Sequence, residues 1–469
     1  MGDITRQFEG KWITTQEFAK LQPLNVFHRQ LESVKFPDDL PRNRHILFRR
    51  RFALDAVRPT ALFISADDYY KLYINGRFVT MGPCPGYHFH YYYNKIDITD
   101  YLKPGDNVIA VHTYYQGLIN RVWVSGDCRH GLIMDMVGPQ GLLLCSDEQF
   151  RCHAHTGYMP CGIVGYETQF MEQYDSGAPE VGFERPEFDD SAWENASIRA
   201  HLDYELYEQP TQQLVVESVA PVSIETRGRL VRCDFGGMYV GYLSAIATGK
   251  RGSAIELRCG QELREDGSVR SDLRCNCRYE ERWILSGGKD ELKQYDYKSF
   301  RYAELELPEG CELASGSIRL LARHYPFELH AAPNAGDAQS LAVWELCVRS
   351  LKYGVQEVIQ DCMDREKGQY LGDGCYTALA HMIATRDPAI ARKLIDDSLR
   401  SAFVNPGLMT CSTCSFMQEI AEYPLMLPFT MLAYWRLTGD AAQLEQWYEP
   451  TAAMLDFYRA QYEHADHLL

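Results

Sequence analysis

The chain has 469 residues, of which 46% are apolar, and its formal net charge at pH 7 is −17. This length predicts about three domains, each large enough for an apolar core. The negative charge argues against nucleic acid or an anionic membrane surface as a partner, whereas a neutral sugar is compatible with it.

The 15 cysteines form no compact disulfide framework, and many lie inside apolar runs. This pattern is typical of reduced thiols in a cytoplasmic protein. The sequence has no run of ~20 apolar residues that could span a membrane, and its first residues lack the apolar core of a signal peptide. We therefore expect a cytoplasmic protein.

Residues 1–40 are punctuated by proline and are interpreted as a lead-in segment. Residues 41–215 predict one or more β-sandwich modules, because short alternating runs are separated by turns such as Asn75-Gly76. The stretches Tyr73-Ile-Asn-Gly76 and Leu102-Lys-Pro-Gly-Asp-Asn-Val-Ile-Ala-Val111 are similar to jelly-roll modules of the galactose-binding-like type.

Residues 216–330 predict a second β-sandwich domain, because residues 253–262 and 300–307 alternate strictly between apolar and polar side chains. Pairs of His or Cys occur in several places, but no second matching pair lies near any of them in the sequence. No metal or cofactor is therefore predicted; the pairs considered are His153 and His155, Cys275 and Cys277, and Cys411 and Cys414.

After Pro326 the apolar spacing becomes helical, and five helices are expected. Asp373 is expected to be the N-cap of the second helix, and Pro450 to kink or split the fifth. The expected helices begin near Asp337, Asp373, Asp387, Pro424 and Gly439.

A charged segment lies between the first two of these helices: Asp361-Cys-Met-Asp-Arg-Glu-Lys-Gly-Gln-Tyr-Leu-Gly-Asp373. It places four carboxylates around Arg365 and adds Tyr370. Crowded carboxylates push their pKa values apart, so that one can hold a proton while another stays ionised. An arginine can orient a carboxylate or a sugar hydroxyl. These groups make up a glycosidase site, although a solvated charged loop is the plain alternative.

The segment resembles the catalytic signature of bacterial α-L-rhamnosidases, glycoside hydrolase family 78. That signature is approximately Asp-Cys-Pro-Gln-Arg-(Asp)-Glu, followed by Gly-Trp-Thr-Gly-Asp. Met363, Asp364 and Tyr370 replace its Pro, Gln and Trp, which leaves the sugar specificity open. The residues that match are Asp361, Cys362, Arg365, Glu366, Gly372 and Asp373.

The resemblance implies inverting hydrolysis of terminal α-L-rhamnose from rhamnose-containing glycosides. Glu366 would be the general acid. Asp361, Arg365 and Asp373 would bind rhamnose hydroxyls, the two carboxylates would raise the pKa of Glu366 by like charge, and Tyr370 would line the sugar subsite. The family has no cofactor in this role, and a homodimer is left open.

The resemblance also implies an (α/α)6 toroid, of which residues 331–469 would form the first part, so the chain is expected to be a fragment or naturally truncated. The family's general base lies on a loop late in the toroid. Glu419 and Glu422 are the nearest candidates here, although acids at these positions also suit the first turn of a helix.

Two other functions are compatible with the sequence. The chain could be a carbohydrate-binding or scaffold protein with a vestigial catalytic segment, in which the sandwich modules bind the glycan. It could also be an (α/α)6 glycosidase that acts on a different sugar.

Overall fold

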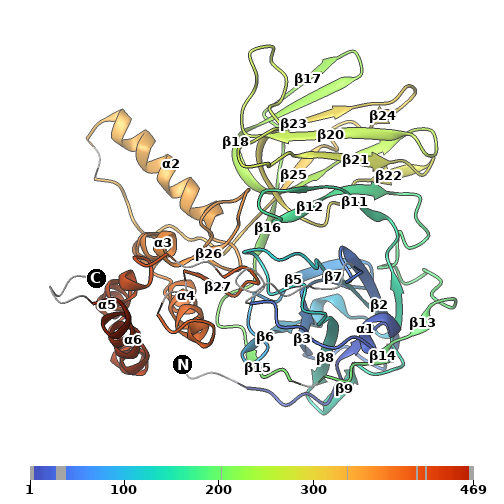
Figure 1. Ribbon diagram of the computed structural model, residues 1–469. Coiled ribbons are helices and arrows are strands. Elements are labelled where there is room, and N and C mark those ends of the chain that lie inside the picture. Colours follow the sequence, from blue (N-terminus) through green and yellow to red (C-terminus); the bar gives the residue numbers. More distant parts are fainter. Residues whose placement is uncertain are drawn as a thin grey trace.

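The computed structural model describes residues 5–27, 39–201, 203–334, 336–407, 410–417 and 420–463. Figure 1 shows a pair of sheets at the lower right, a second group of sheets above it, and helices on the opposite side. The predicted order of β-rich regions followed by a helical region is confirmed.

The first β region is a sandwich of a seven-stranded and a six-stranded sheet. The strand orders are β14-β1-β8-β3-β6-β15, with β9 beside β8, and β13-β10-β2-β7-β4-β5. Apolar side chains from both sheets, such as Phe48, Ile64 and Ile109, form the core between them. The strands are β1 (Ile13–Thr14), β2 (Arg44–Leu54), β3 (Ala61–Asp67), β4 (Tyr69–Ile74), β5 (Arg77–Gly82), β6 (Tyr91–Asp97), β7 (Gly105–Tyr115), β8 (Gly131–Gly138), β9 (Gly141–Cys145), β10 (Arg151–Ala154), β13 (Glu194–Asn195), β14 (Ser197–Ile198) and β15 (Leu206–Glu208), with a short helix α1 (Gln16–Ala19) and a 3-10 turn η1 (Thr99–Tyr101).

The predicted hairpin at Asn75-Gly76 is confirmed. Ile74 pairs with Arg77 across the turn. Asn75 and Gly76 have φ values of 52° and 83°, the left-handed conformation that a two-residue hairpin requires at both positions.

The second β region contains a nine-stranded sheet, ordered β11-β12-β21-β20-β23-β18-β25-β16 with β17 beside β18, and a small sheet ordered β22-β19-β24. Its core includes the fully buried Trp283 and Phe300. The strands are β11 (Tyr158–Val164), β12 (Gln169–Asp175), β16 (Val215–Val219), β17 (Ser223–Arg227), β18 (Leu230–Ser244), β19 (Ile246–Thr248), β20 (Ala254–Gly260), β21 (Glu280–Ile284), β22 (Lys289–Glu291), β23 (Lys298–Glu306), β24 (Glu312–Leu313) and β25 (Arg319–His324).

Strands β11 and β12 belong to this second sheet although they precede β13–β15 of the first sandwich in the chain. Strand β12 runs parallel to β21, with Tyr174 opposite Trp283. A hairpin that lies between β10 and β13 in the chain therefore belongs to the sheet of the second β region, and the turn between β11 and β12 is held beside the helical region.

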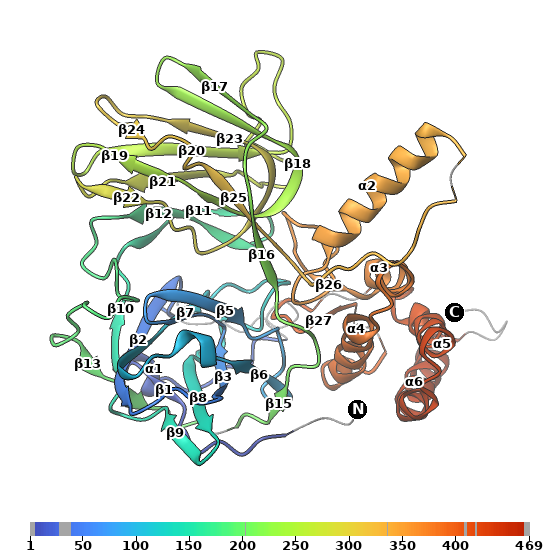
Figure 2. The ribbon, with the colours of Figure 1, turned by 180° about the vertical axis from the view of Figure 1, so that it is seen from behind.

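The helical region contains five helices among the described residues, as predicted. Asp337 and Asp440 cap the first and last helices by accepting from the N–H groups of Ser340 and Gln443. Figure 2, seen from behind, shows α2 standing apart from the other four. The elements are α2 (Ala338–Gly354), β26 (Gln369–Tyr370), α3 (Leu371–Thr385), α4 (Ala389–Arg400), η2 (Ser401–Phe403), β27 (Cys411–Ser412), η3 (Pro424–Met426), α5 (Leu427–Thr438) and α6 (Ala441–Tyr462).

Two local predictions about the helices need correction. Asp373 is not an N-cap, because α3 begins at Leu371 and Asp373 lies in its first turn. The N–H of Leu371 donates to the carbonyl of Thr410 at 2.7 Å, so the helix starts directly from the β26–β27 pairing. Pro450 does not split the last helix, which continues through it from Ala441 to Tyr462. No helix in the described part of the chain is long and apolar enough to cross a membrane.

Candidate active site

The acid-rich segment between α2 and α3 forms a closed loop. The N–H of Asp361 donates to the carbonyl of Gly368 at 2.9 Å, and Asp361 Oδ1 accepts from the N–H of Gly368 at 2.9 Å. Lys367, directly before Gly368, has a φ of 57°, a conformation uncommon for a residue other than glycine. The loop is therefore held shut by one residue pair and contains a strained position beside Glu366.

Glu366 and Arg365 contact each other within this loop. Arg365 Nε donates to Glu366 Oε1 at 3.3 Å. The Arg365 side chain is more exposed than that of Glu366. Burial raises the pKa of Asp361 to about 6, and the nearby charge of Glu366 acts in the same direction. The loop thus holds one carboxylate paired with arginine, that of Glu366, and one whose proton affinity is raised, that of Asp361.

Tyr370 is buried at the end of the loop. Its hydroxyl accepts from Arg121 Nε at 2.5 Å. Burial raises the pKa of the Tyr370 phenol well above its usual value, with smaller contributions from Cys411 and from Glu366, which is within hydrogen-bonding range. The structure brings Tyr370 and Glu366 together; the lining of a sugar subsite by the Tyr370 ring stays a prediction.

Asp373 is exposed at the start of α3, on the same side as Tyr423. Burial and the adjacent charge of Asp373 raise the pKa of the Tyr423 phenol, to which Asp361 also contributes. The Tyr423 ring packs directly on the backbone of Gly372, where an added Cβ would lie 2.6 Å from Cε1. Glycine in this part of the signature therefore has a steric role, and it brings Tyr423 next to both aspartates.

The turn between β11 and β12 contacts the loop from the β side. The N–H of Tyr166 donates to the carbonyl of Arg365 at 3.3 Å, and the hydroxyl of Thr168 donates to the same oxygen. At Gly165, whose φ is 64°, an added Cβ would lie 2.3 Å from that carbonyl oxygen. The backbone position of Arg365, and with it that of Glu366, is fixed by these contacts.

Lys367 anchors the other side of Glu366. Its ammonium is buried, donates to the carbonyl of Tyr297 at 2.8 Å and to Gln169 Oε1, and lies 3.6 Å from the Tyr297 ring centroid. Burial lowers the pKa of Lys367 to about 8, which the nearby Asp296 opposes. The residue that follows Glu366 is thus inserted into the second β region.

Sequence reasoning missed both Arg121 and Lys367 as residues of this site. Lys367 lies inside the signature, and its unusual backbone conformation has no sequence signal. Arg121 is far from the loop in the sequence, so only the fold brings Arg121 and the loop together.

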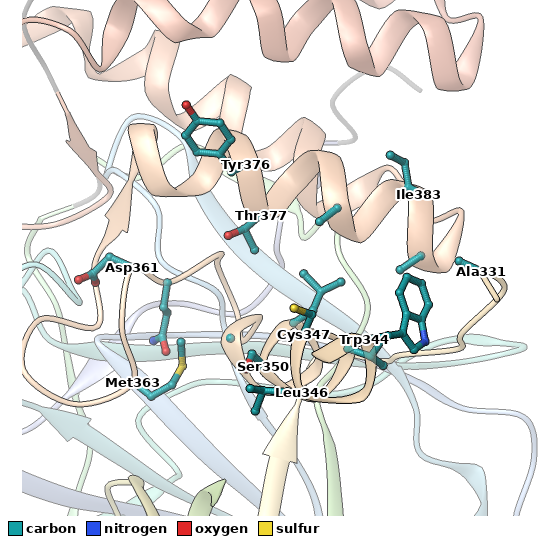
Figure 3. Close-up of a pocket in the computed structure, with 16 residues that line it drawn as sticks. Ala331, Trp344, Leu346, Cys347, Ser350, Asp361, Met363, Tyr376, Thr377 and Ile383 are labelled. Carbon is teal, nitrogen blue, oxygen red and sulfur yellow. The ribbon is translucent and has the colours of Figure 1, made fainter. Parts of the chain in front are cut away.

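Two cavities flank the loop. One, of about 700 Å³, lies between α2 and α3 and has mostly apolar walls. Figure 3 shows Asp361 and Met363 at one end of it and Trp344 and Ile383 at the other. The second, also about 700 Å³, is lined by residues 236–240 of β18, by α2 and by residues 362–365. The site therefore has space on two sides for parts of a ligand.

The general base is not located by these contacts. Glu422 is exposed in the turn before η3, and Glu419 lies outside the described residues. In the part of the chain that the structure describes, no group of three His, Cys, Asp or Glu side chains is arranged to hold a metal ion.

Three family models match the chain in succession. The α-L-rhamnosidase N-terminal domain matches residues 55–226, and the bacterial α-L-rhamnosidase concanavalin-like domain matches residues 225–319. The bacterial α-L-rhamnosidase 6 hairpin glycosidase domain matches residues 337–468, which include the whole loop. Both β regions and the helical region are thus covered, in the order that these domains take.

Several proteins similar to this chain are themselves described as rhamnosidases. A curated α-L-rhamnosidase of Streptomyces avermitilis is 23% identical over 288 residues, which are 58% of this chain and 28% of that protein. The chain therefore spans less than a third of the length of this relative. The rhamnosidase structure of Bacillus sp. GL1 has a TM-score of 0.84 at 15% identity and covers 97% of this chain and 70% of its own. The rhamnosidase structure of Dictyoglumus thermophilum has a TM-score of 0.78 at 20% identity, and the match covers 97% of this chain and 52% of that protein.

These structures show the same fold at low identity, while the family models match nearly the entire chain from residue 55 onward. The loop described above, with Asp361, Glu366 and Gly372, lies within the range that the 6 hairpin glycosidase model matches. The chain therefore belongs to the family of bacterial α-L-rhamnosidases, glycoside hydrolase family 78.

Proposed function

We propose that this chain provides the general acid, and the residues around it, of an inverting glycosidase that removes terminal α-L-rhamnose from rhamnose-containing glycosides. The closed loop of residues 361–368 carries the proposal, because it holds Glu366 beside Arg365 and within the field of Asp361. The family match supports the choice of rhamnose as the sugar.

In the proposed reaction Glu366 protonates the glycosidic oxygen as the bond to the anomeric carbon breaks. A second carboxylate, about 6.5–9.5 Å from the acid in inverting enzymes, removes a proton from a water molecule on the opposite face of the sugar, and the oxygen of that water bonds to the anomeric carbon. Asp361, Arg365 and Asp373 bind the hydroxyls of rhamnose, and Tyr370 lines the same subsite. Glu419 and Glu422 are the candidates for the base within this chain, whereas in the family the base lies on a later loop of the (α/α)6 toroid.

The test is turnover of a panel of aryl glycosides by the full-length protein. We expect hydrolysis of the α-L-rhamnoside, and a loss of ~10²–10⁴-fold in Glu366→Gln on substrates with poor leaving groups. Asp364→Asn is the matched control. Asp364 lies in the same loop, but its carboxylate accepts from Gln261 Nε2 at 3.0 Å and from the backbone N–H of Arg365 at 2.7 Å, whereas Glu366 contacts the Arg365 guanidinium.

Two results would contradict the proposal. Binding of rhamnosides without turnover by the full-length protein would favour a carbohydrate-binding protein with a vestigial loop. Faster turnover of another glycoside would show a glycosidase that acts on a different sugar. The replacements of the family residues at Met363, Asp364 and Tyr370 are the reason to test this alternative.

A further inference from the structure

A loop of the first β sandwich reaches the candidate active site. It connects β7 to β8 and is fixed to the segment after β27 by backbone hydrogen bonds. The N–H of Phe416 donates to the carbonyl of Asn120 at 2.7 Å, and that of Ser415 donates to the carbonyl of Trp123 at 2.9 Å. Arg121, between these two contacts, is therefore held in one place.

The Arg121 guanidinium lies between two aromatic rings beside the acid loop. Its Cζ is 4.0 Å from the Phe416 ring centroid and 5.1 Å from that of Tyr166. Nε donates to the Tyr370 hydroxyl at 2.5 Å. A Cβ added to Gly368 would lie 2.9 Å from Arg121 Cβ, so the arginine packs against the closed loop itself.

The charge of Arg121 has no counter-ion among the described residues, although the side chain is only 9% exposed. Two other buried arginines each hold a carboxylate: Arg49 pairs with Asp190 at 3.1 Å, and Arg323 pairs with Glu357. Buried charges in proteins are normally paired, because an unpaired one loses its hydration without compensation. Among the described residues the guanidinium is thus a largely buried cation without a carboxylate partner, and it lies beside the Tyr370 hydroxyl of the candidate site.

We propose that Arg121 binds a carboxylate of the substrate, so that the site prefers rhamnose linked to a uronic acid. The planar guanidinium suits a carboxylate through two parallel hydrogen bonds, and its Nη atoms donate to no described residue. Tyr166 and Phe416 on either side offer apolar surfaces for a sugar ring. This inference rests on the proposed function, since the acidic sugar is the leaving group of that reaction.

The test compares a disaccharide of rhamnose α-linked to a uronic acid with its methyl ester, which removes only the charge. Binding of both is measured by titration calorimetry in the full-length Glu366→Gln variant, where turnover does not interfere. We expect the acid to bind ~10–100-fold more tightly than the ester, as for a hydrogen-bonded charged group. Arg121→Met should abolish this preference, and Arg121→Lys should keep part of it because it keeps the charge but not the fork.

Arg44→Met is the control: Arg44 is an exposed arginine of the same sandwich, paired with Glu17 at 3.1 Å, and its loss should leave the preference unchanged. Equal binding of acid and ester, or a preference that survives Arg121→Met, would overturn the proposal. Hydrolysis of the neutral aryl rhamnoside by the wild type is measured separately. If that hydrolysis fails while the acid preference persists, the catalytic proposal falls and the assignment of Arg121 stands.

Discussion

The β regions and the helical region differ in how they enclose apolar side chains. In the two β regions Phe48, Trp283 and Phe300 are completely buried. On the helices, Leu346 is 64% exposed, Tyr376 is 71% exposed and Phe429 is 74% exposed. The sheets therefore form closed cores, whereas the helices present apolar surface that calls for further packing.

This difference matters because the acid loop lies where the two meet. Its firmest contacts run to the β side: Tyr166 and Thr168 bind the carbonyl of Arg365, and Lys367 is inserted toward Tyr297. On the helical side, the cavity between α2 and α3 leaves Asp361 beside open space. The β regions thus hold the backbone around Glu366 in position, whereas the helical side of the loop borders a cavity.

Limited proteolysis tests the comparison most broadly. We expect the first cuts in residues 338–463, while the strands of both β regions resist, because regions with few buried apolar contacts open locally at low free energy. Mass spectrometry of the early fragments locates the cuts. First cuts within β2, β7 or β18 would show that the closed cores are not the more stable part.

Gly165→Ala is expected to have the largest effect of a single substitution on the β side. The new Cβ would meet the carbonyl oxygen of Arg365 at 2.3 Å, and displacement of a catalytic group by ~1 Å can cost ~10²-fold in activity. The measurement is kcat/KM for an aryl α-L-rhamnoside with the full-length protein. Gly310→Ala is the matched control, since Gly310 has a similar φ of 73° with no atom within 4 Å of the added Cβ; equal activity of both variants would refute the role of this contact.

Lys367→Met should lower kcat by ~10-fold without lowering stability near pH 7. Burial lowers the pKa of Lys367 to about 8, so the folded state binds this proton more weakly than the unfolded state. The unfavourable contribution of the charged form is full below about pH 8. The stability of the wild type rises with pH between about 8 and about 10.4, the ordinary pKa of lysine in the unfolded chain.

Activity of the wild type should fall as the pH rises through about 8, because the neutral amine no longer holds Glu366 in place through the same contacts. The variant should lack that decline. Thermal unfolding and kcat are measured from pH 6 to 10 for the wild type and the variant, to check the predicted pH dependence of stability and of activity. A variant that loses stability at pH 7 and keeps the wild-type pH profile would show that Lys367 is only structural.

Asp361→Asn tests the helical side of the loop and should give a smaller, mixed result. Burial raises the pKa of Asp361 to about 6, so its contribution to stability is full below about pH 4 and is lost as the pH rises through about 6. The variant should therefore gain in stability relative to the wild type between pH 4 and pH 7, while its affinity for rhamnose falls.

Unfolding midpoints at pH 4 and pH 7 and calorimetric titration with rhamnose are the measurements for Asp361→Asn. Asp364→Asn serves as the control in the same loop. If the relative stability of Asp361→Asn does not change with pH, the carboxyl is not held in the environment described here.

Features set by neighbouring residues were predictable from the sequence, and features set by distant ones were not. The hairpin at Asn75-Gly76, the helix starts near Asp337 and Gly439, and the signature from Asp361 to Asp373 follow from local residue chemistry. Aspartate and glycine at these positions interrupt the apolar spacing, so the two helix starts could be placed to within a few residues. Asp373 was misplaced because the strand pairing of Gln369 and Tyr370, invisible in the local pattern, ends directly before Leu371 and starts the helix earlier.

Arg121 and the turn at Gly165 could not have been found in this way. Both reach the loop only because β11 and β12 join the second sheet and the β7–β8 loop crosses to the helical region. An isolated arginine or glycine carries no signal of such a contact. The site therefore combines one segment readable from sequence with supports that only the fold assembles.

The assignment of Glu366 as the proton donor is tested most directly by its dependence on the leaving group. The measurement compares kcat/KM of Glu366→Gln and wild type, in the full-length protein, on an activated aryl α-L-rhamnoside and on a rhamnose-containing disaccharide. The account predicts a loss of ~10²–10⁴-fold on the disaccharide and a much smaller loss on the activated substrate, which needs little protonation. An equal loss on both substrates, or near wild-type activity on the disaccharide, would contradict it.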